Sequence, residues 1–204
     1  MGDAGTIRAF LALPPDPEWG ESALGIVSEL RAASPPASWT KPSSWHLTLK
    51  FLGQATRDAL ASFSDAMARP AAETAQGELP PGGAAVFPPR GPARVLALGF
   101  APSPALSALE KLAAAAETAS RRLGLEREDR PFRPHVTLAR VRERWPAAAV
   151  ERFRTAATSR SLPAWKAHRC VLYASRLGPA GAVHTELAAW PFAGPSGAGG
   201  TADE

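Results

Sequence analysis

Two short segments of this chain share one pattern: a histidine, an apolar residue, a threonine and a leucine. Residues 46–49 read His-Leu-Thr-Leu and residues 135–138 read His-Val-Thr-Leu, so two of the chain's four histidines carry the pattern. Each copy lies in a strand-like run, and side chains two apart on a strand point to the same face. Each segment therefore predicts one imidazole and one hydroxyl side by side. Because one copy falls in each half of the chain, the pattern favours a fold with two similar halves.

Hydrophobic periodicity predicts strands and helices that interleave along the chain. The expected helices are Glu18–Ala33, Arg57–Met67, Ala105–Leu123 and Pro146–Ala156. The expected strands are Ile7–Leu13, a short one at Trp39, Trp45–Gly53, Arg94–Phe100, Val136–Val141, Trp165–Ser175 and Ala182–Ala189, with short strands at most in Glu78–Pro89. Pro70 is expected to close the second helix, and Pro104 suits the start of the third.

This order of elements predicts an internally duplicated α+β fold, in which two similar lobes meet at a cleft. A chain of 204 residues has the size of one ordinary domain. We expect residues 1–192 to form a single bilobal domain. Ala193–Glu204 is rich in glycine and poor in apolar residues, so we expect it to be a disordered tail.

The composition, with 45% hydrophobic residues, is that of a soluble globular protein. No apolar run approaches the roughly 20 residues that span a bilayer, and the N-terminus lacks the layout of a signal peptide, so we expect a cytoplasmic protein without a membrane partner. The single cysteine, Cys170, excludes an internal disulfide and a cysteine-based zinc site. The net charge of +4 comes mainly from arginine, which suits a polyanionic partner but is also typical of GC-rich coding sequence.

The paired motifs indicate acid–base chemistry on a phosphate. His46 and His135 have side chains that donate or accept a proton near neutral pH. Thr48 and Thr137 have hydroxyls that can bond phosphate oxygens, although threonine is also common on strands for its backbone preference alone. With no metal-ligand cluster and no second cysteine beside them, we expect no metal or cofactor. The other two histidines lack the threonine, and we expect both to be structural: His168 and His184.

The residues that flank the motifs allow two interpretations. Arg130 and Arg133 either reach a phosphate or lie on a solvated loop. Lys50 shares the strand parity of His46 but lies farther along, and we expect it to be peripheral. Four aromatic residues flank the motifs and either stack on nucleobases or pack in the core: Trp39, Trp45, Phe51 and Phe132.

Residues 45–53 (Trp-His-Leu-Thr-Leu-Lys-Phe-Leu-Gly) and 130–140 (Arg-Pro-Phe-Arg-Pro-His-Val-Thr-Leu-Ala-Arg) resemble the signatures of the RNA 2′,3′-cyclic phosphodiesterases. These enzymes belong to the two-histidine phosphoesterase superfamily and were first described as 2′-5′ RNA ligases. The resemblance extends from Arg8–Pro14 through Phe87-Pro88 and Arg94–Leu96 to Leu172–Leu177, and so covers nearly the whole chain except the tail. Trp45 stands where an aliphatic residue is commoner, and His184 where an aromatic residue is expected.

The resemblance implies a bilobal, pseudo-symmetric fold of two antiparallel sheets flanked by helices, with the motifs facing each other across a central cleft. It implies hydrolysis of RNA 2′,3′-cyclic phosphate ends to 2′-phosphomonoesters, with RNA or a nucleotide as the substrate. We expect the protein to be a monomer. One histidine takes a proton from water while the other protonates the departing ribose oxygen. We assign the acid role to His46 and the base role to His135, and expect Thr48 and Thr137 to hold the non-bridging oxygens.

Two alternatives remain open at this point. The same groups can catalyse the reverse reaction, 2′-5′ RNA end joining, as a side activity. A different class of function is a tRNA- or nucleotide-binding module without catalysis, although binding alone would not require both imidazoles.

Overall fold

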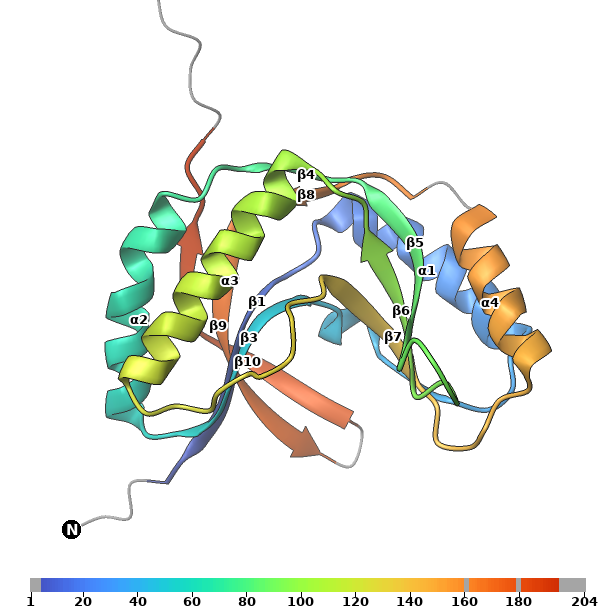
Figure 1. The fold of residues 1–204 in the computed structure, drawn as a ribbon, viewed down its shortest axis with the longest axis horizontal. Helices are drawn as coiled ribbons and strands as arrows, with labels where there is room; N and C mark the ends of the chain where they lie inside the picture. Colours follow the sequence, from blue (N-terminus) through green and yellow to red (C-terminus); the bar gives the residue numbers. More distant parts are fainter. Residues whose placement is uncertain (1–4, 160–161, 179–180, 195–204) are drawn as a thin grey trace, which may run out of the picture.

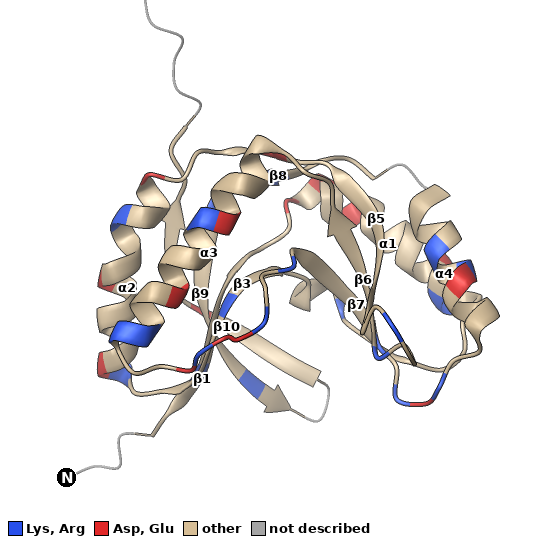
Figure 2. Cartoon of the chain, in the orientation of Figure 1, with Lys and Arg blue, Asp and Glu red and all other residues tan. Residues whose placement is uncertain are grey.

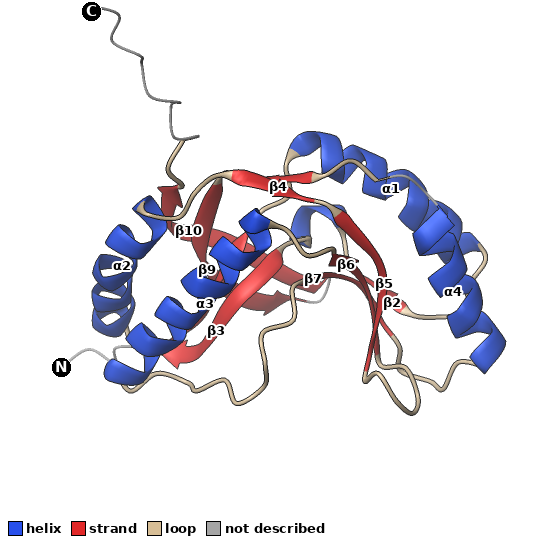
Figure 3. Cartoon of the chain, turned by 45° about the horizontal axis from the view of Figure 1, so that its top comes forward, coloured by secondary structure: helices blue, strands red, loops and turns tan. Residues whose placement is uncertain are grey.

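The computed structural model describes residues 5–159, 162–178 and 181–194. Over these residues the chain forms one eight-stranded antiparallel sheet and one two-stranded sheet, with helices packed against them (Figures 1 and 3). The helices are α1 (Pro17–Ala32), α2 (Arg57–Ala72), α3 (Pro104–Arg122), α4 (Ala147–Ser159) and the short 3₁₀ helix η1 (Pro42–Ser44). The strands are β1 (Ile7–Leu13), β2 (Ser38–Trp39), β3 (Leu47–Ala55), β4 (Gly77–Leu79), β5 (Pro81–Phe87), β6 (Val95–Phe100), β7 (His135–Arg140), β8 (Trp165–Ala167), β9 (Arg169–Gly178) and β10 (Gly181–Pro191).

The large sheet consists of two groups of strands joined at a narrow point. Its order is β10-β9-β1-β3-β7-β6-β5, with β2 paired to β7. The two motif strands, β3 and β7, lie at the centre and pair through Leu47 and Val136, whereas β1 pairs with β3 along its whole length. The predicted α+β class, with antiparallel sheets flanked by helices, is confirmed. The two expected sheets are the two halves of this one, and they meet where the motifs begin.

The two halves repeat the same order of elements. In the first half β1, α1, β3 and α2 follow one another, and in the second half β6, α3, β7 and α4 do so. Each motif strand pairs antiparallel with the first strand of its own half. The helices exchange partners between halves: α1 packs beside α4, and α2 beside α3 (Figures 1 and 3). This arrangement has the pseudo-symmetry that the repeated motif predicts.

Three helices begin with a side chain that accepts a hydrogen bond from a backbone amide of the first turn. Asp16 caps α1, Thr56 caps α2 and Ser103 caps α3, at 3.1, 3.2 and 3.1 Å. Helix α2 continues past its predicted end at Met67, with Pro70 inside its last turns. Met67 and the residue four places later, Ala71, are both fully buried on one face. Their burial favours continuation of the helix and outweighs the backbone hydrogen bond that proline removes.

The predicted strand Trp165–Ser175 is two strands in different sheets. Strand β8 pairs with β4, and β9 pairs with β1 and β10 in the large sheet. The carboxylate of Asp16 links β8 to α1, because it caps α1 and also accepts a hydrogen bond from the amide of Lys166 at 2.8 Å. The sequence pattern that predicts a strand is the alternation of apolar residues, and this alternation does not change where the strand changes its pairing partner.

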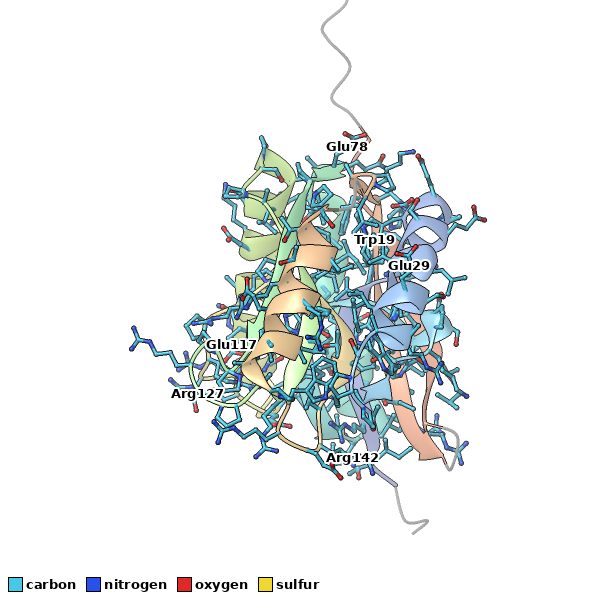
Figure 4. The ribbon with its side chains drawn as sticks, turned by 90° about the vertical axis from the view of Figure 1, so that its right-hand side faces the viewer. Trp19, Glu29, Glu78, Glu117, Arg127 and Arg142 are labelled. Carbon is cyan, nitrogen blue, oxygen red and sulfur yellow. The ribbon has the colours of Figure 1, made fainter. Side chains whose placement is uncertain are left out.

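The core fills the space between the helices and the sheets. Trp19 of α1 is 1% exposed and packs on Trp165 with ring centroids 4.8 Å apart; Figure 4 shows it on the inner side of its helix. Phe63 of α2 and Phe153 of α4 are buried to the same degree. Aromatic side chains bury large apolar areas, so these residues contribute much of the free energy that holds helices to sheet.

Ala193, at the start of the predicted tail, forms backbone hydrogen bonds with the segment that follows α2. The backbone of Ala193 donates to the carbonyl of Thr74 at 2.8 Å and accepts from Gln76 at 2.9 Å. Ala193, the first residue of the predicted tail, is therefore paired with the fold. Residues 195–204 lie outside the described residues. In the described part of the chain, no helix is both long and apolar enough to cross a membrane.

Candidate active site

The pairing of β3 with β7 brings both histidine motifs to one place. Leu47 and Val136 stand opposite each other and are fully buried. Their chain neighbours point to the other face of the sheet, because side chains alternate along a strand. In an antiparallel pair, the residue before Leu47 lies on the side of the residue after Val136. The pairing therefore brings the two motifs to the same region of the sheet, and all four residues are half-buried: His46, Thr48, His135 and Thr137.

Both motif histidines are oriented by a backbone carbonyl two residues earlier. Nδ1 of His46 lies 2.8 Å from the Ser44 oxygen, and Nδ1 of His135 lies 2.6 Å from the Arg133 oxygen. A carbonyl oxygen only accepts hydrogen bonds, so Nδ1 carries the proton in each ring. Nε2 is then the unprotonated nitrogen of each neutral ring. Each ring also packs on a phenylalanine, His46 on Phe10 and His135 on Phe87, with centroids 4.7 Å apart.

The site disfavours positive charge on both imidazoles. Burial lowers the pKa of His46 to about 4, with smaller contributions in the same direction from the charges of His184, His135 and Arg140, against the hydrogen bond to Ser44. Burial also lowers the pKa of His135, where the bond to Arg133 opposes it and the charge of Arg140 adds to it. Both rings are therefore neutral near pH 7 in the free protein.

A β-bulge at the same position of each motif decides which later residues join the site. In β3, Thr48 and Lys50 pair with adjacent residues of β1, which leaves Leu49 as the extra residue. In β7, Thr137 and Ala139 pair with adjacent residues of β6, which leaves Leu138 as the extra residue. Each bulge reverses the alternation of side chains beyond it.

The bulge in β3 corrects the prediction for Lys50. Simple alternation places Lys50 on the face of His46, but its side chain is 2% exposed on the opposite face. Its ammonium lies 3.0 Å from the carboxylate of Glu117 on α3 and donates to the Glu126 carbonyl at 2.6 Å. Lys50 is a buried structural residue that ties β3 to α3 and to the loop before β7. Figure 4 labels Glu117 and Arg127 on this flank of the molecule.

The bulge in β7 adds a residue that the sequence analysis missed. Simple alternation places Arg140 opposite His135, yet Arg140 is exposed and its charge acts on both His135 and His46. The pattern of apolar residues contains no sign of the bulge. The one available signal was the position of Arg140 at the end of the second matching segment.

The two arginines predicted for phosphate binding lie in the loop before β7. Arg133 is exposed, and its carbonyl orients His135. Arg130 is exposed and forms an ion pair with Glu128 through two hydrogen bonds of 2.8 and 3.0 Å. Figure 2 shows basic and acidic residues along this loop, between α3 and β7. A role for either guanidinium in phosphate binding stays a prediction.

The flanking aromatic residues differ in their surroundings. Trp45 is 3% exposed and packs edge-on against Trp19, so it belongs to the core. Trp39 and Phe132 are half-buried and also pack on the core. Phe51 is 40% exposed and lies 6.1 Å from Phe10, centroid to centroid, beside the site.

The remaining histidines also differ. His168 is exposed, and its Nδ1 donates to the Lys166 carbonyl at 3.0 Å, away from the motifs. His184 was expected to be structural, but its ring lies edge-on to that of His46 with centroids 5.3 Å apart. Its signal in the sequence was its departure from the aromatic residue expected at that position.

The single cysteine, Cys170, is buried in β9. Burial raises the pKa of the Cys170 thiol to about 12, so it is not a thiolate nucleophile near neutral pH. Over residues 5–159, 162–178 and 181–194, no group of three or more His, Cys, Asp or Glu side chains is arranged to hold a metal ion. A groove of about 480 Å³ lies apart from the motifs, between the connection of β5 to β6 and the start of α4, lined by residues that include Pro88, Trp145 and Arg154.

The fold and the site define a duplicated α+β protein with one His/Thr pair on each of two central strands. The chain belongs to the 2′-5′ RNA ligase superfamily, whose family model matches residues 14–179. This membership confirms the resemblance seen in the motifs.

Individual relatives agree with this family. The chain is 30% identical over 189 residues to an RNA 2′,3′-cyclic phosphodiesterase of Geobacillus stearothermophilus; the match covers 91% of this chain and 57% of that protein. Among solved structures, TT0787 of Thermus thermophilus is similar with a TM-score of 0.74 and 25% identity, covering 92% of this chain and 99% of that one. Escherichia coli LigT in complex with 3′-AMP has the same fold, with a TM-score of 0.68, 22% identity and coverage of 92% and 98%.

Proposed function

We propose that this protein hydrolyses RNA 2′,3′-cyclic phosphate ends to 2′-phosphomonoesters, with His46 and His135 as the acid–base pair and without a metal ion. The observation that carries the proposal is the antiparallel junction of β3 and β7, which presents two His/Thr pairs on one face with both Nδ1 atoms engaged by backbone. The name of the Geobacillus relative supports the substrate class, although this chain spans 57% of that protein's length.

The reaction needs one neutral and one protonated imidazole. The neutral ring accepts a proton from water as the water oxygen attacks phosphorus. The protonated ring gives its proton to the 3′ oxygen as the P–O3′ bond breaks, which leaves the phosphate on the 2′ oxygen. The hydroxyls of Thr48 and Thr137 donate to the non-bridging oxygens, where negative charge builds up. The reverse sequence joins RNA ends through a 2′-5′ linkage, and we retain it as a side activity.

The pKa directions favour one assignment of roles. His46 has the pKa of about 4 and is neutral under most conditions, which is the form that a base requires. This favours His46 as the base and His135 as the acid, the opposite of the assignment made from the sequence. His135 gains its proton when the substrate binds, because the negative phosphate raises the pKa of a neighbouring imidazole.

Arg140 supplies the positive charge nearest to the reaction in this proposal. Its charge acts on both imidazoles, so a phosphate between them would lie within its field. A guanidinium can bond two phosphate oxygens at once. Arg130 and Arg133, both exposed in the preceding loop, would act on the RNA farther from the cyclic phosphate.

One assay separates this proposal from its alternatives. Purified protein is incubated with 2′,3′-cyclic AMP in EDTA, and the product is identified by chromatography. We expect 2′-AMP at a rate that EDTA does not change. Binding without turnover would indicate a nucleotide-binding module. Formation of 3′-AMP would mean that the 2′ oxygen, and not the 3′ oxygen, is the leaving group. Activity that depends on added Mn²⁺ or Zn²⁺ would indicate that the histidines are metal ligands.

A further inference from the structure

His184 of β10 lies beside His46, although it belongs to neither motif. The two imidazoles meet at 88° with centroids 5.3 Å apart, and the His184 ring also meets Phe10 at 80° and 4.9 Å. Strand β10 is held by its antiparallel pairing with β9, and the hydroxyl of Ser44 also donates to the Ala182 carbonyl at 3.3 Å. The same Ser44 orients His46 through its own carbonyl. The proximity of the two rings is therefore a consequence of how β10 is anchored.

His184 is surrounded mainly by aromatic rings from the neighbouring strands. From β1 it faces Phe10, and from β9 it faces Tyr173, 6.2 Å away, and Ser175, its register partner. Burial, with the nearby Glu186 carboxylate, raises the pKa of Tyr173 to about 12, so this phenol stays neutral. Glu186 on the same strand is held in an ion pair with Arg169 at 3.1 Å. The charges of His135 and Arg140, both on β7, act on the His46 ring.

Packing alone does not account for a histidine at this position. Nδ1 of His184 is buried, and no group among the described residues forms a hydrogen bond with it. A buried polar atom without a partner costs stability, and a phenylalanine would fill the same space and keep the ring contacts without that cost. A histidine here is therefore unfavourable for the fold, which points to a role for its proton.

We propose that His184 is a positioning residue that keeps His46 deprotonated in mildly acidic solution, by carrying a positive charge edge-on to the His46 ring. This inference rests on the proposed function, in which neutral His46 accepts the proton of water. Burial lowers the pKa of His184, but His46 is the ring whose pKa falls to about 4. The inference requires that His184 takes up its proton before His46 as the pH falls. Its charge then opposes protonation of His46, because like charges at this spacing repel.

The test is His184→Phe, which keeps an aromatic ring and removes the charge. Without the neighbouring cation, the pKa of His46 rises, so the acid limb of kcat/KM for 2′,3′-cyclic AMP should move to higher pH by on the order of one pH unit. NMR titration of the His46 ring should show the same upward shift without relying on activity. His168→Phe is the matched control, since it removes an exposed histidine away from the site and should move neither curve.

His184→Gln gives the same prediction with a neutral polar side chain, and it replaces the phenylalanine variant if that variant does not fold. The inference is overturned if, in either variant, the acid limb and the His46 titration match the wild type, and His184 is then a packing residue. A downward shift of the His46 pKa would also overturn it. If the protein proves inactive but the NMR titration moves as expected, the coupling stands and the proposed function fails. If the protein is active but the acid limb does not move in the variants, the proposed function stands and the inference about His184 fails.

Discussion

Replacing Lys50 with methionine tests how the buried face of β3 is held. The Lys50 ammonium is 3.0 Å from the Glu117 carboxylate and 2.6 Å from the Glu126 carbonyl. Methionine keeps most of the apolar contacts but forms neither bond. A hydrogen bond that involves a charged group contributes about 1.5–3 kcal/mol, while the Glu117 side chain, 25% exposed, can regain water. We expect a net loss of about 2 kcal/mol, equivalent to about 4–8 °C in Tm for a protein of this size.

Urea denaturation followed by circular dichroism measures this loss. The control is Lys111→Met, which removes an exposed lysine from the same helix as Glu117 and should change stability little. Burial raises the pKa of Glu117, but the bonds from Lys50 and from the Glu128 amide outweigh it and lower the pKa overall. A carboxyl with a depressed folded-state pKa stabilises above its unfolded pKa and loses that contribution as the pH falls through the folded value. The difference between wild type and Lys50→Met should therefore shrink in acid. Equal losses for both lysine variants would refute the buried ion pair.

Three further predictions concern the proposed reaction. His46→Ala and His135→Ala should each lower kcat by about 100-fold or more, the usual contribution of a positioned acid or base. The control variant His168→Ala should match the wild type. A near-wild-type rate in either motif variant would show that its histidine takes no part in the chemistry. Thr48→Val and Thr137→Val should each reduce kcat/KM by roughly 10- to 100-fold, since each loses one hydrogen bond to a charged group; larger losses than in the histidine variants would contradict this division of roles. The pH profile of kcat/KM should be a bell, because the base must be neutral and the acid protonated. Its optimum should lie below about 6.5, the ordinary histidine pKa, since both pKa values are lowered; an optimum above neutral pH would be inconsistent with these shifts.

Much of the fold is predictable from the sequence, because its elements are amphipathic and their ends carry local signals. Pro104 marks the start of α3 as expected, and Ser103 caps the helix there. The failures occur where tertiary contacts override local preference. Pro70 lies within a helix because buried neighbours continue it, and the predicted strand from Trp165 divides because its two parts pair in different sheets.

The candidate site is also predictable in part, where it depends on local pattern and not on tertiary pairing. His46, Thr48, His135 and Thr137 share a face because residues two apart on a strand do so in any register, and this much follows from the sequence. Proximity between the motifs depends on the pairing of β3 with β7, which no local pattern specifies. His184 approaches His46 from a strand that is more than 100 residues away in the chain, as the hydrogen bond of Ser44 to Ala182 shows, with a sequence separation of 138.

The two bulges explain the errors at Lys50 and Arg140 together, and they also show how the halves differ. Lys50 leaves the site because the bulge at Leu49 reverses the alternation, and Arg140 enters it because the bulge at Leu138 does the same. The position equivalent to Arg140, five residues after the motif histidine, is Phe51 in the first half, where it lies by Phe10. The duplication thus gives each half the same imidazole and hydroxyl, but places an aromatic ring beyond one bulge and a cation beyond the other. In the proposed reaction, this asymmetry directs the phosphate charge toward the half that contains Arg140 and leaves His46 in the less polar half. That is the environment in which an imidazole stays neutral and can serve as the base.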